Sequence, residues 1–392
     1  MMPLDGITVL DLTRVLSGPY CTMLLADMGA RVIKVEQPGK GDDTRAWGPP
    51  FLEGESAYFL SINRNKESVT IDFKQPGGLK LLEELIAKAD VLVENFRPGT
   101  LTKLGLDYET LSKRHPRLIY CSISGFGHTG PRWKQPGYDA IMQAEGGLMS
   151  ITGTADGPPV RLGVAIVDIV SGMFAAYGTA MALLARERTG RGQEVDLAML
   201  DATVALLTYQ AGNFFASGKV PARLGNRHPS IVPYETFSAS DGDFVLAVGN
   251  DEQWKKFCAV AELPPDERFT TNRQRVSDYD ALRPFVADRL RQRPRQFWIE
   301  ALTRAGVPCG SVRTFYELFA DPQLDAREMI AMVEHATIGP LKALGVPIKL
   351  SETPGAVRTP PPTLGQHTDA VLRHDLGLSA DAIAALRQQK VI

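Results

Sequence analysis

The sequence predicts an α/β fold, in which a large, Rossmann-like doubly wound domain is combined with a smaller α+β domain. Apolar, β-prone runs alternate with helical segments between residues 7 and 124, and a more charged segment that begins near residue 244 interrupts this pattern. Alternating strands and helices are typical of parallel sheets with helices on both faces. Since a domain usually takes roughly 100–200 residues, the chain of 392 residues has room for two or three domains.

The elements of the large domain follow in order from the N-terminus. Tyr20–Met28 is expected to be a helix, because Pro19 suits a first helical turn and Gly29 commonly ends a helix. A loop at Arg14–Gly18 precedes this helix, and a second helix is expected at Gly77–Ala89. The predicted strands are Ile7–Leu12, Arg31–Glu36, Ser68–Phe73, Asp90–Glu94 and Leu118–Ser124.

The long apolar run from Val164 to Ala185 is expected to be a helix in the core of a soluble protein. It is rich in glycine and alanine and holds one acid, Asp168. A carboxylate inside a bilayer is costly, and Arg161 and Arg186 flank both ends, so no charge asymmetry marks a membrane span. We therefore expect no membrane association.

The predicted organisation changes after residue 200. Residues 1–200 are expected to form the large domain, 201–225 a linker and 226–324 the small domain, while about 325–392 complete the large domain. The small domain should contain a strand at Phe244–Val248 and charged helices at 251–262 and 279–305. A short helix is expected at 379–389.

The composition excludes several classes of protein. Lys and Arg number 43 against 45 Asp and Glu, a net charge of −2, whereas a nucleic-acid-binding surface usually leaves a basic excess. The four cysteines form no C-x-x-C pair, which argues against a disulfide scaffold or a zinc ribbon. The N-terminus lacks the basic start and apolar core of a signal peptide. We expect a cytoplasmic protein that binds no nucleic acid.

One glycine-rich motif imitates a dinucleotide-binding site. Gly125–Gly130 reads G-F-G-H-T-G, but that fingerprint needs a helix that opens there and faces a pyrophosphate. Two prolines in the following Pro131–Gly137 make such a helix improbable. The sequence also has no Walker loop and no H-E-x-x-H motif, and its six histidines show no ligand spacing. We therefore expect neither a nucleotide cofactor nor a metal.

Asp168 is the most informative charged residue. It is the only charge between Leu162 and Ala185, and it stands where the apolar helix should begin. One interpretation is structural: its carboxylate caps the helix by accepting backbone N–H bonds. The other is that a helix N-terminus keeps this buried carboxylate ionised as a nucleophile in a dry site. The two interpretations are compatible.

Ordered motifs carry a family resemblance along essentially the whole chain. They are Pro3–Gly18, Gly29–Glu36, Val93–Gly99, Gly125–Pro131, Pro136–Asp139, Gly163–Gly172, Gly190–Val195, Gly225–Pro229, Gly306–Gly310, Asp321–Gln323 and Gly365–Asp369. With these motifs the chain resembles the family III CoA-transferases of the CaiB/BaiF type, which include formyl-CoA and carnitine CoA-transferases. The motifs are specific for the family and much less specific for a substrate.

The resemblance implies a reaction and a catalytic residue. Asp168 falls where the family has its nucleophilic aspartate. It would attack a donor acyl-CoA to form an aspartyl–acyl anhydride, and the CoA thiolate would return to form an aspartyl-CoA thioester. An acceptor carboxylic acid would then receive the CoA. One thioester is made as another is broken, so the exchange needs no ATP, in agreement with the missing phosphate-binding loop.

The resemblance also implies where CoA is bound. The implied contacts are Leu16, Ser17, Ile71, Asp72, Phe73, Lys74, Asn95, Phe96, Arg97, Lys103, Gln135, Pro136, Gly137 and Tyr138. These residue types suit CoA, because Arg and Lys pair with phosphates and Asn and Tyr offer hydrogen bonds. The chain departs from the family at Gln37, where relatives carry Arg, so Lys40 or Arg45 is expected to replace that contact.

The substrate acid is expected to meet the Gly225–Pro229 loop. By resemblance, Gly225, Asn226 and His228 would lie over the acyl carboxylate, and a glycine lets backbone N–H groups approach an oxyanion closely. The loop lacks the run of consecutive glycines that marks the formyl-CoA enzymes. We therefore expect a dicarboxylic acceptor, with succinyl-CoA as a possible donor.

Two alternative functions stay open. The α-methylacyl-CoA racemases resemble the N-terminal motifs and share the aspartate, but they also use a histidine base in the segment where this chain has Tyr138. A neutral tyrosine, with a pKa of about 10, is a poor base at neutral pH. The chain could also be a non-catalytic acyl-CoA-binding protein, although burying a charge without a use for it is costly. For the transferase, the resemblance implies a homodimer of two interlocked chains.

Overall fold

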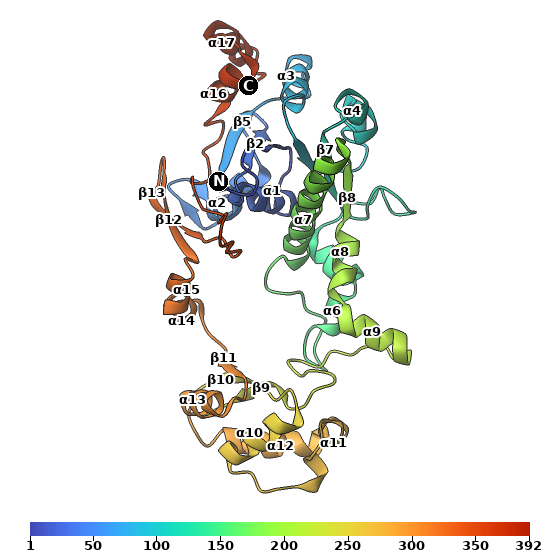
Figure 1. Ribbon diagram of the computed structural model, residues 1–392, viewed down its shortest axis with the longest axis vertical. Helices are drawn as coiled ribbons and strands as arrows, with labels where there is room; N and C mark the ends of the chain where they lie inside the picture. The colour runs from blue at the N-terminus through green and yellow to red at the C-terminus, as the bar shows by residue number, and fades with distance from the viewer. The chain divides into compact units, whose positions relative to one another are not determined.

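The computed structural model describes residues 1–392 and divides into two compact units (Figure 1). Unit 1 comprises Met1–Leu148, Leu162–Ala211 and Pro322–Ile392, and unit 2 comprises Met149–Arg161 and Gly212–Asp321. The chain therefore leaves unit 1 twice and returns to it, so each unit is assembled from segments that are distant in sequence.

Unit 1 is built around a six-stranded sheet in the order β5-β2-β1-β6-β7-β8. The strands are β1 (Thr8–Asp11), β2 (Arg31–Glu36), β5 (Lys66–Thr70), β6 (Val91–Glu94), β7 (Ile119–Ser124) and β8 (Glu194–Ala198). All neighbouring pairs are parallel. The predicted parallel sheet is therefore confirmed; its sixth strand, β8, was not foreseen, and β5 begins and ends earlier than Ser68–Phe73.

Helices cover both faces of this sheet. Successive strand residues point to opposite faces, so Leu10 joins one buried cluster while its neighbour Val9 joins another. The helices α3 (Pro76–Ile86), α4 (Tyr108–Arg114), α16 (Thr368–Leu376) and α17 (Ala380–Gln388) contribute to the Leu10 cluster. The helices α1 (Ser17–Asp27), α5 (Asp139–Glu145), α7 (Ile166–Thr189) and α8 (Met199–Leu206) contribute to the Val9 cluster. Apolar burial on both sides fixes the sheet in the middle of a three-layer unit.

Helix α7 is the predicted long apolar helix. It is long and apolar enough to pass a length-and-composition test for a membrane span, a test that core helices of soluble proteins also pass. Its inner residues, such as Val167, Ala175 and Ala182, are buried in the Val9 cluster. We use the name α7 stripe for a second row of residues, at near-helical spacing, that this chain leaves exposed: Met173, Tyr177, Met181 and Leu184.

Unit 2 has a different architecture. Its sheet is antiparallel, in the order β11-β10-β9, with β9 (Tyr234–Ser238), β10 (Asp243–Ala247) and β11 (Cys309–Ser311). The helices are α10 (Asp251–Ala261), α11 (Asn272–Ser277), α12 (Tyr279–Leu290) and α13 (Arg295–Ala305). Phe244, Phe257 and Trp298 are fully buried in its core. The predicted strand and charged helices are confirmed, except that residues 291–294 divide the expected helix 279–305 into α12 and α13.

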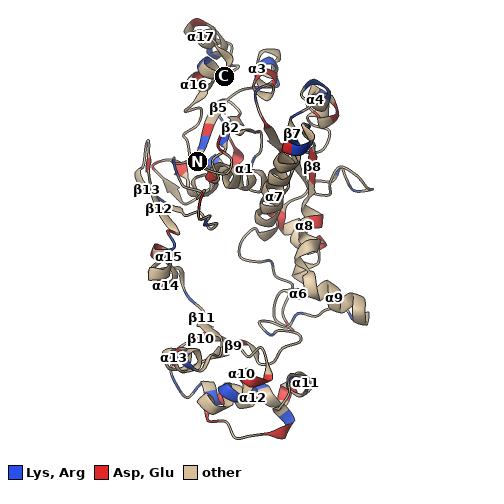
Figure 2. Cartoon of the chain, viewed as in Figure 1, with Lys and Arg blue, Asp and Glu red and all other residues tan.

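The remaining elements are short or lie where the chain passes between units. They are β3 (Phe51–Leu52), β4 (Glu55–Ser56), α2 (Ala57–Ile62), α6 (Leu148–Ile151), α9 (Thr208–Ser217), α14 (Phe315–Phe319), α15 (Pro322–Ala326), β12 (Ile330–His335) and β13 (Gly339–Leu344). Residues 201–225 were expected to be a linker, but they contain most of α8 and all of α9. Helix α9 carries no charged side chain and buries no residue in this chain, so it lacks the pattern that predicts a packed helix (Figure 2).

Candidate functional site

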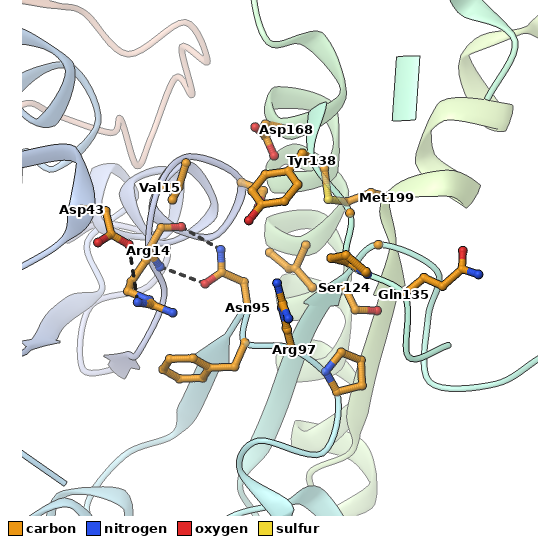
Figure 3. A pocket seen from close by; sticks show the side chains of 17 residues that line it. Arg14, Val15, Asp43, Asn95, Arg97, Ser124, Gln135, Tyr138, Asp168 and Met199 are labelled. Atoms are coloured by element: carbon orange, nitrogen blue, oxygen red, sulfur yellow. Dashed lines mark hydrogen bonds and ion pairs between the residues drawn. The ribbon is translucent and has the colours of Figure 1, made fainter. Parts of the chain in front are cut away.

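A cavity in unit 1 opens where β1, β6 and β7 end (Figure 3). Parallel sheets commonly bind ligands at this edge, because the loops after neighbouring strands converge there. The lining residues are Arg14, Val15, Ser17, Asp43, Asn95, Phe96, Arg97, Pro98, Ile123, Ser124, Gly125, Gln135, Pro136, Gly137, Tyr138, Asp168 and Met199. The structure thus brings Asp168 together with Ser17 and with two of the predicted CoA-binding segments, 95–97 and 135–138.

Asp168 is the third residue of α7, and its backbone is fixed by a second carboxylate. The residue before α7 is Ala165, which has no side chain able to cap the helix. Instead, Asp139 Oδ1 on α5 accepts the N–H of Val167 at 2.9 Å and lies 3.5 Å from the N of Asp168. Gln143 donates to the other oxygen of Asp139 at 2.7 Å. The capping interpretation of Asp168 is therefore wrong, because Asp139 caps the helix, while Asp168 lines the cavity.

The surroundings of Asp168 favour a protonated carboxyl more than the sequence suggested. Burial and the neighbouring Asp139 raise the pKa of Asp168 to about 7, while a hydrogen bond from Ser17 acts in the opposite direction. The sequence predicted a carboxylate that the helix N-terminus keeps ionised, whereas a pKa of about 7 leaves Asp168 only partly ionised at neutral pH. A carboxylate with a raised pKa is more basic than an ordinary one, which suits attack on a carbonyl carbon.

Ser17 is held against Asp168 by close packing of α1 and α7. Ser17 is the first residue of α1 and is 4% exposed. Gly172 allows the approach, because a Cβ at that position would lie only 2.6 Å from the carbonyl oxygen of Ser17. No side chain caps α1, and the first N–H groups of a helix have no partners within it. The cavity is therefore lined both by the carboxyl group of Asp168 and by the first residue of a helix whose N-terminus has no side-chain cap.

Two residues near Asp168 were missed as functional candidates. Asp139 belongs to the Pro136–Asp139 motif, but its sequence position gave no sign that it caps α7. Tyr58 follows β4 on α2, and burial together with the charges of Asp168 and Asp139 raises the pKa of Tyr58 to about 12. Tyr58 is therefore a neutral phenol close to two carboxyl groups, which only the tertiary fold reveals.

A second cavity in unit 1 lies beside the first and shares Arg14 and Phe96 with it. It is lined by the predicted CoA-binding residues Ile71, Asp72, Phe73 and Lys74, and by Gln37. Lys103 is exposed on a 3₁₀ turn and lines neither cavity, and Leu16 is buried and lines neither. Their predicted contacts with CoA gain no support from these cavities.

Neither predicted substitute for the missing arginine at position 37 is free. Arg45 pairs with Glu36 at 2.7 Å, and its guanidinium lies 3.6 Å from the centre of the Phe59 ring. Lys40 pairs with Asp43 at 2.6 Å. Lys74 and Arg14 are the cations that line the second cavity together with Lys34, which is buried. Arg14 also lies 3.4 Å from Asp43, so Lys74 is the exposed cation of this cavity that forms no ion pair.

The three predicted acid-binding residues belong to unit 2. Gly225 adopts φ +62° and donates its N–H to the carbonyl of Gly153 at 2.9 Å. His228 stacks on Tyr234 with ring centres 5.4 Å apart, and burial lowers the pKa of His228. Asn226 lies in the same turn. The left-handed backbone conformation at position 225 favours glycine, which explains Gly225 on structural grounds. A contact of the three residues with the acid stays a prediction.

The glycine motif Gly125–Gly130 opens no helix. Gly127 and Gly130 have positive φ, and turns and bends follow until α5 begins at Asp139. The prediction that no helix opens directly after this motif is therefore confirmed. No group of three or more His, Cys, Asp or Glu side chains is placed to hold a metal ion.

Comparisons with known proteins agree on one family. The profile of CoA-transferase family III matches residues 4–368. A succinyl-CoA:glutarate CoA-transferase of Mus musculus is 43% identical over 100% of this chain and 91% of its own length. An acetyl-CoA:oxalate CoA-transferase of Acetobacter aceti is 44% identical over 90% of this chain and 92% of its own. The crystal structure of a CaiB/BaiF family protein from Brucella suis is 44% identical and has a TM-score of 0.85 over 95% of this chain and 99% of that one.

Proposed function

Because the chain belongs to CoA-transferase family III, we propose that Asp168 carries the transfer of CoA from succinyl-CoA to a dicarboxylic acid. One observation supports this proposal most strongly. Asp168 is a carboxyl group with a pKa of about 7, in the cavity that also holds two predicted CoA-binding segments. A carboxylate placed there can attack a bound thioester without a metal or a nucleotide.

The first half of the proposed reaction transfers CoA to the enzyme. A carboxylate oxygen of Asp168 attacks the thioester carbonyl carbon, the C–S bond breaks, and an aspartyl–acyl anhydride and CoA thiolate result. The thiolate then attacks the aspartyl carbonyl, which releases the donor acid as a carboxylate and leaves an aspartyl-CoA thioester. The first N–H groups of α1, which has no side-chain cap and whose first residue lines the same cavity, would stabilise the oxyanion of these steps.

The second half is the first in reverse with a different acid. The acceptor carboxylate attacks the aspartyl-CoA carbonyl, giving a new mixed anhydride and CoA thiolate. Attack of the thiolate on the acceptor's acyl carbon forms the product thioester and restores the Asp168 carboxylate. No proton or phosphate is consumed, because each step exchanges one carboxylate or thiolate for another.

The racemase alternative has less support. A proton transfer at the carbon beside the thioester would need a second base opposite Asp168, and Tyr138 stands where the racemases carry histidine. Tyr138 is 61% exposed, and a phenol is a weak base at neutral pH. The relatives named above are CoA-transferases, which agrees with the transferase reaction.

A panel of acids tests the proposed substrates. Succinyl-CoA is incubated with glutarate, other dicarboxylates, oxalate and a monocarboxylate, and new thioesters are separated by chromatography. We expect glutarate and dicarboxylates of similar length to give the highest kcat/KM; succinate is left out because its product would be the donor thioester itself. Faster transfer to oxalate, the dicarboxylate of two carbons, would contradict the expected chain length, and no transfer to any acid would contradict CoA transfer itself.

The pH profile of the reaction reports the ionisation of Asp168. The carboxylate is the reactive form, so kcat/KM should rise with pH and level off above about 7, following the raised pKa of Asp168. Ser17→Ala removes the hydrogen bond that lowers this pKa, so the midpoint should move to higher pH. Ser171→Ala is the matched control, because the Ser171 hydroxyl on α7 is buried without a hydrogen-bond partner. An unchanged midpoint in Ser17→Ala would contradict the assigned contact.

We also propose that the protein is a homodimer. The α7 stripe is exposed in this chain, with Tyr177 64% and Met173 51% exposed, and a second copy would bury apolar surface of this kind. Light scattering should give twice the mass of the 42.8 kDa chain. Tyr177→Arg should shift the protein toward monomer, and a monomer mass in the wild type would contradict the proposal.

A further inference from the structure

The loop between β1 and α1 contains a strained residue next to the candidate site. Val15 adopts φ +70°, in the left-handed region where a β-branched side chain is a genuine outlier. Such a conformation persists only where the surrounding structure over-determines it, and strain of this kind gathers at functional sites. Val15 and Ser17 both line the cavity that holds Asp168.

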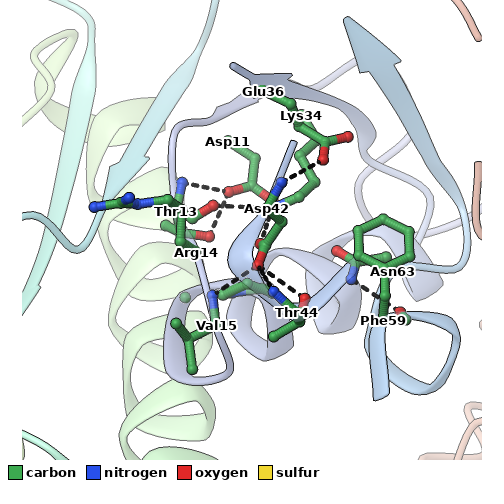
Figure 4. Close-up of polar contacts among 12 residues, drawn as sticks. Asp11, Thr13, Arg14, Val15, Lys34, Glu36, Asp42, Thr44, Phe59 and Asn63 are labelled. Carbon is green, nitrogen blue, oxygen red and sulfur yellow. Dashed lines mark hydrogen bonds and ion pairs between the residues drawn. The ribbon is translucent and has the colours of Figure 1, made fainter. Parts of the chain in front are cut away.

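One buried ion pair holds the backbone on both sides of this turn (Figure 4). Lys34 Nζ on β2 donates to the carbonyl of Thr13 at 2.9 Å and pairs with Asp42 Oδ2, also at 2.9 Å. Asp42 Oδ1 accepts the N–H of Val15 at 3.3 Å. The side chains of Lys34 and Asp42 are both 0% exposed. The pair therefore binds the carbonyl of Thr13 through Lys34 and the N–H of Val15 through Asp42.

Asp42 is itself fixed from its own segment. Its Oδ1 also accepts the N–H of Thr44 at 3.0 Å and the hydroxyl of Thr44 at 2.8 Å. Its own N–H donates to Glu36 Oε2 at 2.9 Å. These bonds hold the Asp42 carboxylate in place, so a movement of the loop would break its hydrogen bond with the N–H of Val15.

A second buried pair holds the two ends of the same loop. Asp11 Oδ1 accepts the N–H of Thr13 at 2.9 Å, and Asp11 Oδ2 lies 3.1 Å from Lys66 Nζ. Lys66 Nζ also donates to the carbonyl of Pro19 at 2.9 Å. The backbone groups that begin and end the loop are thus bound to charged side chains that are fully buried.

Burying these charged side chains costs desolvation free energy. Burial by itself lowers the pKa of Lys34, but the carboxylates of Asp42 and Asp11 raise it overall, so the amine stays charged. Replacing a buried ion pair with apolar side chains of similar volume is often neutral or stabilising. Stability alone therefore does not account for a buried Lys34–Asp42 pair whose further bonds go to the backbone of a loop at the candidate site.

We propose that Lys34 and Asp42 are positioning residues: their ion pair holds Val15 in its left-handed conformation and so keeps Ser17 and the N-terminus of α1 directed at Asp168. Neither residue takes part in a bond-making step. This proposal rests on the proposed function of Asp168. It adds that the Lys34–Asp42 ion pair sets the position of Ser17 and α1 relative to Asp168.

The test uses the double variant Lys34→Met, Asp42→Asn with and without Val15→Gly. The double variant leaves no unpaired buried charge at the two positions, and the introduced amide retains an acceptor for Thr44. We expect kcat to fall at least about tenfold, because displacements of about 1 Å can cost roughly 100-fold. Glycine adopts the left-handed conformation without strain, so adding Val15→Gly should recover most of the kcat that the double variant loses.

The rescue separates positioning from a merely structural role. A double variant with wild-type kcat, or a triple variant no more active than the double, would overturn the proposal. If the double variant is folded but too unstable for kinetic measurements, urea unfolding gives the same comparison: Val15→Gly must stabilise that background more than it stabilises the wild type, and equal effects would overturn the proposal.

Hydrogen–deuterium exchange distinguishes this inference from the proposed function. The N–H of Val15 should exchange at least about tenfold faster in the double variant, because the loop loses the bond from Lys34 to the carbonyl of Thr13 and the neutral amide at position 42 accepts from Val15 more weakly than the carboxylate. This result is expected whether or not the protein transfers CoA. Unchanged exchange contradicts the inference alone, and a wild type without transfer activity contradicts the proposed function alone.

Discussion

Asp168→Asn is expected to lower kcat/KM for CoA transfer by roughly 10⁴-fold or more, since both covalent intermediates of the proposed reaction form on the Asp168 carboxylate. Asparagine has nearly the same shape as aspartate, so the loss can be assigned to the missing carboxylate oxygen. Steady-state transfer between succinyl-CoA and the best acid measures the effect. Residual activity within about tenfold of the wild type would show that another group accepts the acyl chain.

The same variant should fold at least as well as the wild type in alkaline solution. The pKa of Asp168 is raised from 3.8 to about 7 in the folded protein. Between these values the folded state holds a proton that the unfolded chain has lost, so the contribution of Asp168 to stability falls as pH rises through this window. The side-chain amide of the variant cannot ionise, and Asp168→Asn should therefore melt no lower than the wild type at pH 8, which thermal unfolding checks. A large drop in melting temperature would make the lost activity a folding defect.

Gly172→Ala is expected to damage both stability and activity through one contact. The new Cβ would lie 2.6 Å from the carbonyl oxygen of Ser17 and 3.2 Å from the N of Cys21. These are backbone atoms, so α1 and α7 must separate, and Ser17 moves away from Asp168. We expect a cost of about 1–3 kcal/mol in the free energy of unfolding and a loss of tenfold or more in kcat/KM. Urea unfolding and steady-state kinetics measure the two effects.

Gly178→Ala supplies the matched control for this prediction. It lies on the same helix and gains the same helix propensity of about 1 kcal/mol. Its new Cβ would meet one methyl group of Val195 at 2.9 Å and no backbone atom. Gly178→Ala should therefore be much closer to the wild type in both measurements. Equal effects at the two glycines would mean that the contact with Ser17 has no special importance.

Much of unit 1 could be predicted because its elements carry local signals. The strand at Arg31–Glu36 was predicted with the bounds that the structure shows, since an apolar, β-prone run ends at turn-forming residues. The exposed sixth strand, β8, offers alternating burial but no apolar run. Helix α9 buries no residue in this chain. Its apolar residues therefore follow no pattern of buried and exposed positions from which the sequence could have predicted a helix.

The site shows the same division between local and tertiary information. Asp168 could be found because a single acid in an apolar helix is conspicuous in sequence. The cap from Asp139, the phenol of Tyr58 and the raised pKa of Asp168 depend on side chains that converge from α5, α2 and α7. Arg45 looked available for phosphate in sequence, but it pairs with Glu36, nine residues earlier in the chain.

The most direct test is to trap the acyl group and the CoA on Asp168. The wild type is incubated with succinyl-CoA in the absence of an acceptor acid, treated with hydroxylamine, digested and analysed by mass spectrometry. Hydroxylamine attacks the aspartyl carbonyl of either intermediate and releases the acid or CoA thiol, so we expect a hydroxamate at Asp168 and none in Asp168→Asn. An enzyme that transfers CoA at its full rate while Asp168 stays unmodified would contradict the account.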